Sequence, residues 1–184
     1  RLLGIAPNGN LLTSTGWECI YRKENGIWSS VGLCGFGTGG QGFAKTASGR
    51  IIITKGGSLR SIYYSDDDGL NWTNANSGNI DWDQTIIADN GHVFVVSSAG
   101  GTGLFGLLKS TDNGTTWSSA NTDVPISNVA TALAKSNNGT LFLIADYTNI
   151  YKSSDNGTTW TFVANCPNTN YGHIAVIGND MYLA

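Results

Sequence analysis

The side chains that could do chemistry in this sequence are acidic, aromatic and cationic residues in predicted loops. The candidates for acid and base catalysis are Glu18, Asp81, Asp83 and Asp146. The candidates for ligand binding are Trp17, Arg60, Trp82, Tyr147 and Tyr171. Aromatic rings pack against the apolar faces of sugars, and paired carboxylates hold hydroxyl groups or act as acid and base. The set indicates a saccharide site; the alternative is a series of solvated loops whose aromatic rings seal contacts between structural units.

The other residues with chemical potential do not indicate a metal or a cofactor, and we expect neither. His92 and His173 stand apart from any cluster of metal ligands, so we interpret both as core or edge histidines. Residues 35–40 match the G-x-G-x-x-G pattern, but a strand is predicted after them. Dinucleotide binding requires a helix at that place, so the match does not imply a nucleotide site.

The three cysteines leave two interpretations open. Cys19 and Cys34 lie on either side of a predicted turn that contains Gly26. If residues 19–34 form a hairpin, the two side chains face each other and could form a disulfide. The alternative is that both are small buried apolar residues. Cys166 has no visible partner in the sequence.

The composition restricts the classes of partner. The chain of 184 residues has a net charge of −3, and only 12% of its residues are charged. Duplex nucleic acid binds cationic surfaces, and no run of Lys or Arg is present, so we expect no nucleic-acid binding. No apolar stretch approaches the roughly 20 residues needed to span a bilayer, so we expect no membrane insertion.

An internal repeat predicts the elements that position these residues. Residues 65–72, 110–117 and 153–160 share the pattern S-x-D-x-G-x-x-W, and residues 24–28 form a shorter, degenerate copy. The repeat glycines at 26, 69, 114 and 157 follow one another at steps of 43, 45 and 43 residues. Between these segments, apolar runs flank a turn rich in Gly and Asn, which is a strong hairpin signal.

Each period therefore contains two hairpins, or four strands, which is the signature of a β-propeller blade. We predict an all-β chain of about four and a half four-stranded antiparallel blades. The predicted blades span residues 1–38, 39–78, 79–126 and 127–168, with a half blade at 169–184. Because a closed ring needs whole blades, we expect a part of a larger propeller of six to eight blades, with the remaining blades in the full-length chain.

The eight-residue pattern resembles the Asp-box, or bacterial neuraminidase, repeat of the sialidase-like superfamily. The resemblance implies that the box forms the turn between the third and fourth strands of a blade. Its Asp would accept backbone N–H bonds, its Gly would adopt a positive φ, and its Trp would pack on a neighbouring sheet. These roles are structural. They fall on Ser65, Asp67, Gly69, Trp72, Ser110, Asp112, Gly114, Trp117, Ser153, Asp155, Gly157 and Trp160.

The resemblance also implies where ligands bind, namely the loops on the face opposite the boxes. One of these predicted loops runs from Lys55 to Arg60, so Lys55 is expected at this face as well. Sialidases of this superfamily carry an Arg triad and a Phe-Arg-Ile-Pro motif, whereas residues 4–7 here read Gly-Ile-Ala-Pro. The chain therefore does not show a sialidase site. Xyloglucanase-like glycosidases use two facing aspartates, a role that Asp81 or Asp83 could share with Asp146.

Three functions remain open on the sequence alone. The first is a non-catalytic propeller that recognises a glycan or a protein in a secreted, surface or virion protein. The second is a glycoside hydrolase with part of its active site outside this sequence. The third is a structural or assembly-factor propeller. The family habit and the low charge favour an extracellular, cell-surface or virion-associated location.

Overall fold

The computed structural model describes residues 2–14, 19–34, 42–56, 61–75, 84–97, 106–121, 124, 129–167, 173–177 and 180–183. Regular structure in these ranges consists of eighteen β-strands. The described ranges contain no helix that could cross a membrane.

The strands form four antiparallel sheets of four strands and one sheet of two strands, and we call each sheet a blade. Blade 1 contains β1 (Leu2–Ile5), β2 (Leu11–Ser14), β3 (Ile20–Glu24) and β4 (Ile27–Ser30). Blade 2 contains β5 (Phe43–Lys45), β6 (Ile51–Lys55), β7 (Ser61–Ser65) and β8 (Thr73–Asn74). Blade 3 contains β9 (Thr85–Ile87), β10 (Val93–Ser97), β11 (Gly106–Ser110) and β12 (Ser118–Ser119). Blade 4 contains β13 (Ala130–Lys135), β14 (Leu141–Ala145), β15 (Asn149–Ser153) and β16 (Thr161–Asn165). The half blade contains β17 (Ile174–Ile177) and β18 (Asp180–Leu183).

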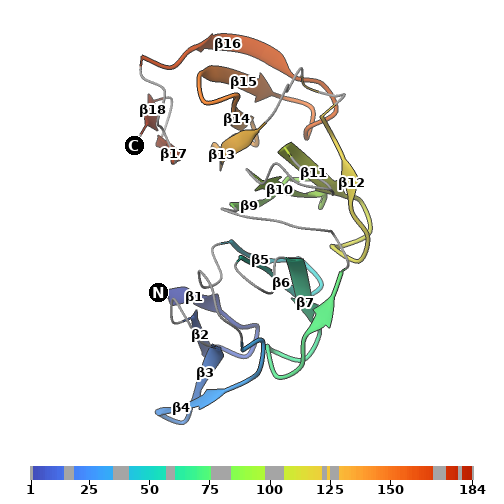
Figure 1. Cartoon of the computed structure of the whole chain (residues 1–184), viewed down its shortest axis with the longest axis vertical. Helices are drawn as coiled ribbons and strands as arrows, with labels where there is room; N and C mark the ends of the chain where they lie inside the picture. Colours follow the sequence, from blue (N-terminus) through green and yellow to red (C-terminus); the bar gives the residue numbers. More distant parts are fainter. Residues whose placement is uncertain are drawn as a thin grey trace.

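The blades are arranged in an arc (Figure 1). In each four-stranded blade the strands pair in chain order. The first strands β1, β5, β9, β13 and β17 lie along the inner side of the arc, and β4, β12 and β16 lie along its outer side. Both chain ends lie on the inner side. Four-stranded antiparallel blades set around an axis define a propeller, so the predicted all-β propeller fold is confirmed.

The hydrophobic core lies in layers between neighbouring blades. Leu12 and Ile20 of blade 1 pack with Ile51, Ile53 and Tyr63 of blade 2, and similar clusters join the later blades. In β6 and β10 every residue is buried, because both faces of these strands pack on a neighbouring blade. Strands buried on both faces are continuous apolar runs rather than alternating ones. Burial of each fully buried Ile or Leu side chain stabilises the folded state by about 1.5–3 kcal/mol.

The degenerate repeat of blade 1 forms a tighter turn than the box. Glu24 pairs directly with Ile27, so only Asn25 and Gly26 connect β3 to β4. Both connecting residues have positive φ, at 50° and 84°, which is the conformation of a two-residue type I′ hairpin turn. A box needs more residues than this turn contains, so residues 24–28 retain the hairpin of the repeat without its Ser and Asp.

Candidate functional site

The three full repeats fold into the same hydrogen-bonded turn. In blade 4, the Ser153 hydroxyl donates to the Asp155 carboxylate (2.7 Å) and accepts the backbone N–H of Gly157 (2.8 Å). The same carboxylate accepts the Thr159 backbone N–H (2.9 Å) and the Thr159 hydroxyl (2.6 Å). The turns at residues 65–72 and 110–117 repeat the serine bonds to the aspartate and the glycine. The local sequence thus satisfies the polar groups that a tight turn exposes.

These hydrogen bonds keep the box aspartates ionised. The bonds from the Thr159 hydroxyl and backbone lower the pKa of Asp155 to about 2. Burial raises the pKa of Asp112, but hydrogen bonds from Thr116, Ser110 and Thr115 outweigh that effect and lower it to about 2. A carboxylate this acidic and this occupied is a poor general base at neutral pH. Both carboxylates are bonded within their own turns.

Each box also contacts the preceding blade through the residue before its glycine. This residue is Asp or Asn with φ between 57° and 63°, which aims its side chain at the turn joining the first two strands of the preceding blade. The three contacts run from the Asn8 N–H to the Asp68 carboxylate (3.2 Å), from the Asn113 side-chain amide to the Ser48 hydroxyl (2.8 Å), and from the Asp89 N–H to the Asn156 side-chain oxygen (3.0 Å).

The box glycines pack against core side chains of the preceding blade. A Cβ atom added to any of them would meet the end of a fully buried side chain of the second strand there. The glycines themselves also have positive φ, between 77° and 82°. Glycine is therefore favoured at these positions for two reasons, the close side chain and the backbone conformation. The glycine and side-chain pairs are Gly69 with Leu12, Gly114 with Ile52 and Gly157 with Phe94.

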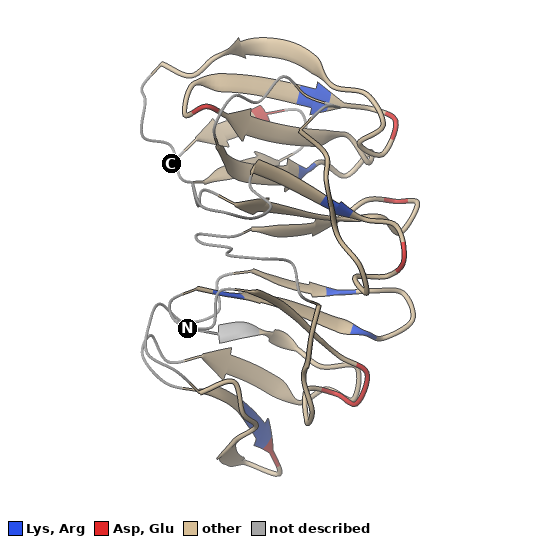
Figure 2. Cartoon of the chain, turned by 45° about the vertical axis from the view of Figure 1, so that its right-hand side comes forward, with Lys and Arg blue, Asp and Glu red and all other residues tan. Residues whose placement is uncertain are grey.

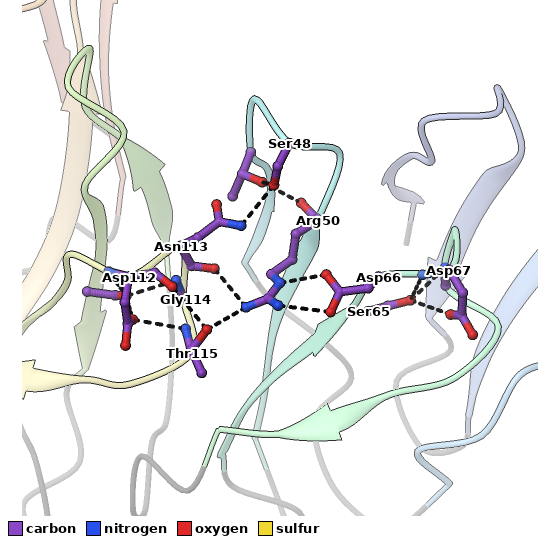
Figure 3. Close-up of polar contacts among 12 residues, drawn as sticks. Ser48, Arg50, Ser65, Asp66, Asp67, Asp112, Asn113, Gly114 and Thr115 are labelled. Atoms are coloured by element: carbon purple, nitrogen blue, oxygen red, sulfur yellow. Dashed lines mark hydrogen bonds and ion pairs between the residues drawn. The ribbon is translucent and has the colours of Figure 1, made fainter.

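Arg50 links blades 2 and 3 through several polar contacts (Figure 3). Its guanidinium makes a two-bond ion pair with Asp66 of the same blade, at 2.7 and 2.8 Å. A third nitrogen donates to the Thr115 hydroxyl (2.6 Å) and the Asn113 carbonyl (3.3 Å) of blade 3. The guanidinium carbon also lies 4.0 Å from the centre of the Tyr64 ring. Arg50 therefore stabilises the interface between blades 2 and 3.

We call the side of the blades that carries these turns the box edge. Figure 2 shows that most acidic residues of the described ranges lie in turns along this edge. Their carboxylates bond to turns and to neighbouring blades, so the polar chemistry of the box edge maintains the fold. The opposite edge, where β9 and β17 begin and where the turn between β14 and β15 lies, is the candidate functional site.

Most of the residues predicted to bind or catalyse at the opposite edge lie outside the described residues. For these residues the binding and catalytic roles, including any pairing of aspartates, remain predictions from the sequence. They are Trp17, Glu18, Arg60, Asp81, Trp82, Asp83 and Tyr171.

Two of the predicted residues form the turn between β14 and β15. Asp146 and Tyr147 both have positive φ, at 49° and 63°. The Asp146 carboxylate accepts the backbone N–H of Val129 (3.3 Å), and the Asp146 N–H donates to the Val129 carbonyl (2.9 Å). Tyr147 is 47% exposed. The Thr148 N–H donates to the Ala145 carbonyl (3.2 Å), so the two positive φ values are those of a type I′ turn. A tyrosine in such a position is uncommon, and unusual backbone conformations of this kind are more frequent at functional sites.

The sequence predicts Lys55 in a loop of the opposite edge, but in the structure it is a buried strand residue. It is the last residue of β6 and is only 2% exposed. Burial lowers the pKa of its ammonium group. The reason is its place on a strand that is buried on both faces, so Lys55 belongs to the packing between blades rather than to a solvated loop.

Sequence reasoning missed one pair at the opposite edge. His173 is not isolated: its Nδ1 lies 2.7 Å from the side-chain nitrogen of Gln84. Gln84 also accepts the backbone N–H of Leu133 in β13 (2.8 Å). The pair joins residues 89 positions apart, so periodicity could not reveal it. The available signal was that each residue directly precedes a first strand. Among the described residues, no group of His, Cys, Asp and Glu could hold a metal.

Cys19 and Cys34 form a disulfide in the structure. It joins the residue before β3 to the segment after β4, at the opposite edge of blade 1. Cys166 is buried and free. Disulfides persist mainly in oxidising compartments, which bears on the location of the protein.

Several solved structures share this fold. The chain superimposes on the GH74 enzyme of Niastella koreensis with a TM-score of 0.67 and 20% identity, over 98% of this chain and 28% of that one. Virginiamycin B lyase of Staphylococcus aureus gives a TM-score of 0.73 and 18% identity, over 98% and 61% of the two chains. PorZ of Porphyromonas gingivalis, a surface component of the type-IX secretion system, gives 0.61 and 15%, over 100% and 30%. Identities this low establish the fold alone, and the chain spans less than two thirds of each protein.

A search of the curated proteins finds no match. Among protein families, the one described as the DUF6242 beta propeller domain matches residues 78–182. This match covers more than half of the 184 residues and includes blades 3 and 4 and most of the half blade. The chain therefore belongs to the DUF6242 beta propeller domain family.

Proposed function

We propose that this propeller is a non-catalytic recognition module that binds a glycan at the edge opposite the boxes. The observation that carries the proposal is Tyr147, an aromatic ring that is 47% exposed at the tip of a strained turn. The hydrogen bonds between Asp146 and the Val129 backbone fix the turn that carries this ring. An exposed, preorganised aromatic ring can pack on a sugar face at a low entropic cost.

The same turn disfavours a catalytic role for Asp146. Its carboxylate already accepts the Val129 N–H, and so serves to anchor the turn. We also infer that the repeats are of the Asp-box type, because the Ser, Asp and Gly of each box make the bonds that this turn requires. In that family the opposite face carries the ligand loops, which agrees with the proposed site.

An extracellular or surface location is part of the proposal. The Cys19–Cys34 disulfide favours an oxidising compartment. PorZ is described as a bacterial surface component, and another protein of similar fold, from Bacteroides thetaiotaomicron, is described as an extracellular domain. This chain superimposes on the latter with a TM-score of 0.67 and 12% identity, over 26% of that chain.

We infer further that additional blades pack against blade 1. Trp160 of the blade 4 box is 8% exposed, with its ring edge-on to Phe94 of blade 3. Trp28, which follows the corresponding turn of blade 1, is 44% exposed. A preceding blade would cover it. Trp28→Ser should therefore cost little stability in these 184 residues, but about 2–3 kcal/mol in a longer natural chain. Equal, small costs in both chains would contradict the additional blade.

The second candidate function is glycoside hydrolysis, which the likeness to two GH74 structures favours. The second of these, the xyloglucanase of Xanthomonas campestris, superimposes with a TM-score of 0.63 and 18% identity, over 89% of this chain and 29% of that chain. Hydrolysis would need two carboxylates about 5–10 Å apart across an open site. Asp81 or Asp83 with Asp146 remains the proposed pair, and Glu18 the further candidate. A scaffold role in a surface assembly is the third.

The experiment is binding to an array of plant, bacterial and host glycans, followed by affinity measurements for the best oligosaccharide. Tyr147→Ala should weaken binding about 10-fold, the effect of one aromatic contact residue. Phe162→Ala is the matched control, because Phe162 is 54% exposed but belongs to β16, which lies along the outer side of the arc. Release of new reducing ends from the bound glycan would favour the hydrolase. Failure to bind any glycan would reject the recognition proposal.

A further inference from the structure

One hydrogen bond at the opposite edge joins two sheets that are not neighbours, namely blade 3 and the half blade. It connects Gln84, directly before β9, to His173, directly before β17, at 2.7 Å. Between them lies β13 of blade 4, whose Leu133 backbone N–H also bonds to Gln84 (2.8 Å). One amide side chain thus links the innermost strands of three successive sheets, on the inner side of the arc.

The Leu133 bond fixes which way the Gln84 amide points. A backbone N–H can only donate, so the atom that it meets must be the amide oxygen. The amide nitrogen therefore faces His173, and an NH₂ group can only donate. Nδ1 of His173 must accept this bond, so it carries no proton. In a neutral imidazole the proton then lies on Nε2, and the tautomer is assigned by the network rather than assumed.

This arrangement leaves the Nε2–H group of His173 as a donor of defined orientation. Its side chain is exposed, and within the described ranges its hydrogen bond is the one to Gln84 through Nδ1. The Nε2–H group is thus held in a fixed direction at the inner side of the opposite edge. A ring whose tautomer and orientation are fixed by a neighbouring side chain is preorganised to donate to a ligand oxygen.

We propose that His173 is a ligand-contacting residue that donates from Nε2 to an oxygen of the bound molecule, with Gln84 as its positioning residue. The inference rests on the proposed recognition function and names a polar contact for it. The ligand chemistry is an oxygen acceptor, either a sugar hydroxyl or a carboxylate of a uronic acid. Tyr147 would supply the apolar contact of the same edge and His173 the directional one.

The first test is the tautomer of His173, measured by nitrogen-detected NMR of histidine-labelled protein at neutral pH. The sequence has only two histidines, so His92→Gln assigns both. Wild-type His173 should show a bare Nδ1 and a protonated Nε2. Gln84→Glu keeps the acceptor for Leu133 but presents a carboxylate to the ring, so Nδ1 should become protonated. If Gln84 only packed against the His173 ring, the Gln84→Glu substitution would leave the tautomer of His173 unchanged.

His92 supplies the matched control. Its Nδ1 meets the Asn90 side-chain nitrogen (3.0 Å), and the Asn90 oxygen accepts the His92 backbone N–H (3.0 Å). Asn90→Asp should therefore invert the tautomer of His92 and leave His173 unchanged. A wild-type His173 with its proton on Nδ1, or an unchanged tautomer in Gln84→Glu, would overturn the assigned role of Gln84.

The second test is titration with cellotetraose, which offers hydroxyl groups, and with tetragalacturonate, which offers carboxylates. At least one should shift the His173 ring signals saturably while the His92 signals stay in place. His173→Phe should weaken that binding about 3- to 10-fold, the effect of one neutral hydrogen bond. If backbone signals shift but His173 does not respond, the inference fails and the recognition function stands. If neither probe shifts any signal, the inference fails for both ligand chemistries, and the array decides the function.

Discussion

Replacing Gly157 by Ala tests the packing of each box on the preceding blade. Gly157 has a φ of 77°, and a Cβ atom there would overlap the ring of Phe94. Phe94 is fully buried in the core cluster between blades 3 and 4, so its ring cannot turn out into solvent to make room. Overpacking a core costs about 1–3 kcal/mol, and a left-handed alanine costs about 1–2 kcal/mol more. We expect Gly157→Ala to lower the free energy of unfolding by about 2–5 kcal/mol.

Gly91→Ala is the matched control for the backbone contribution. Gly91 has a φ of 84°, but a Cβ atom there would meet nothing within 4 Å. Its substitution should therefore cost only the left-handed backbone term, about 1–2 kcal/mol. Urea unfolding followed by tryptophan fluorescence measures both variants. The combined variant Gly157→Ala with Phe94→Leu should cost less than the sum of its parts, because the smaller side chain makes room. Equal losses in the two alanine variants would refute the packing account.

Three further predictions concern the Arg50 ion pair, the box carboxylates and the disulfide. Arg50→Lys should lower stability by about 1 kcal/mol in urea unfolding, because lysine cannot make the two-bond pair with Asp66. Acidification should weaken the fold through Asp112 and Asp155, whose folded pKa of about 2 lies below the usual 3.8. Their stabilisation is present above about pH 4 and is lost as pH falls through about 2; allowing for solvent screening it amounts to about 1 kcal/mol each. A double Asn variant should show a flatter dependence of Tm on pH in this window, and an equally steep one would contradict the assignment. Cys19→Ser should cost about 3 kcal/mol by thermal unfolding, since the disulfide closes a loop of 15 residues, and a loss no larger than that of Cys166→Ser would count against it.

Local patterns were predictable from the sequence because their contacts are local. The box bonds join residues at most four positions apart, such as Ser153 with Gly157, so the eight-residue pattern contains the whole turn. The hairpins are also local, and their repetition predicted the four-stranded blades. The turn at Asn25 and Gly26 shows the limit of the pattern: a shorter spacing selected a type I′ turn, although the glycine kept its place in the repeat.

Contacts between blades were not predictable in the same way. The Asn156 side chain meets the Asp89 backbone 67 positions earlier, and Gln84 meets His173 89 positions later. Such contacts depend on how one sheet is set against the next, which no pattern within a blade encodes. For the same reason Lys55 was predicted as an exposed loop residue, although both faces of its strand are covered by neighbouring blades. The candidate site is built from this kind of contact.

Binding at the opposite edge is measured most directly by chemical-shift mapping of the backbone amides with the best oligosaccharide from the array. We expect saturable shifts at Tyr147 and Thr148, on the edge opposite the boxes, with no shifts at Gly114 and Gly157 and no release of reducing ends. Shifts centred on the box glycines, or hydrolysis of the oligosaccharide during the titration, would contradict a recognition module that binds at the opposite edge.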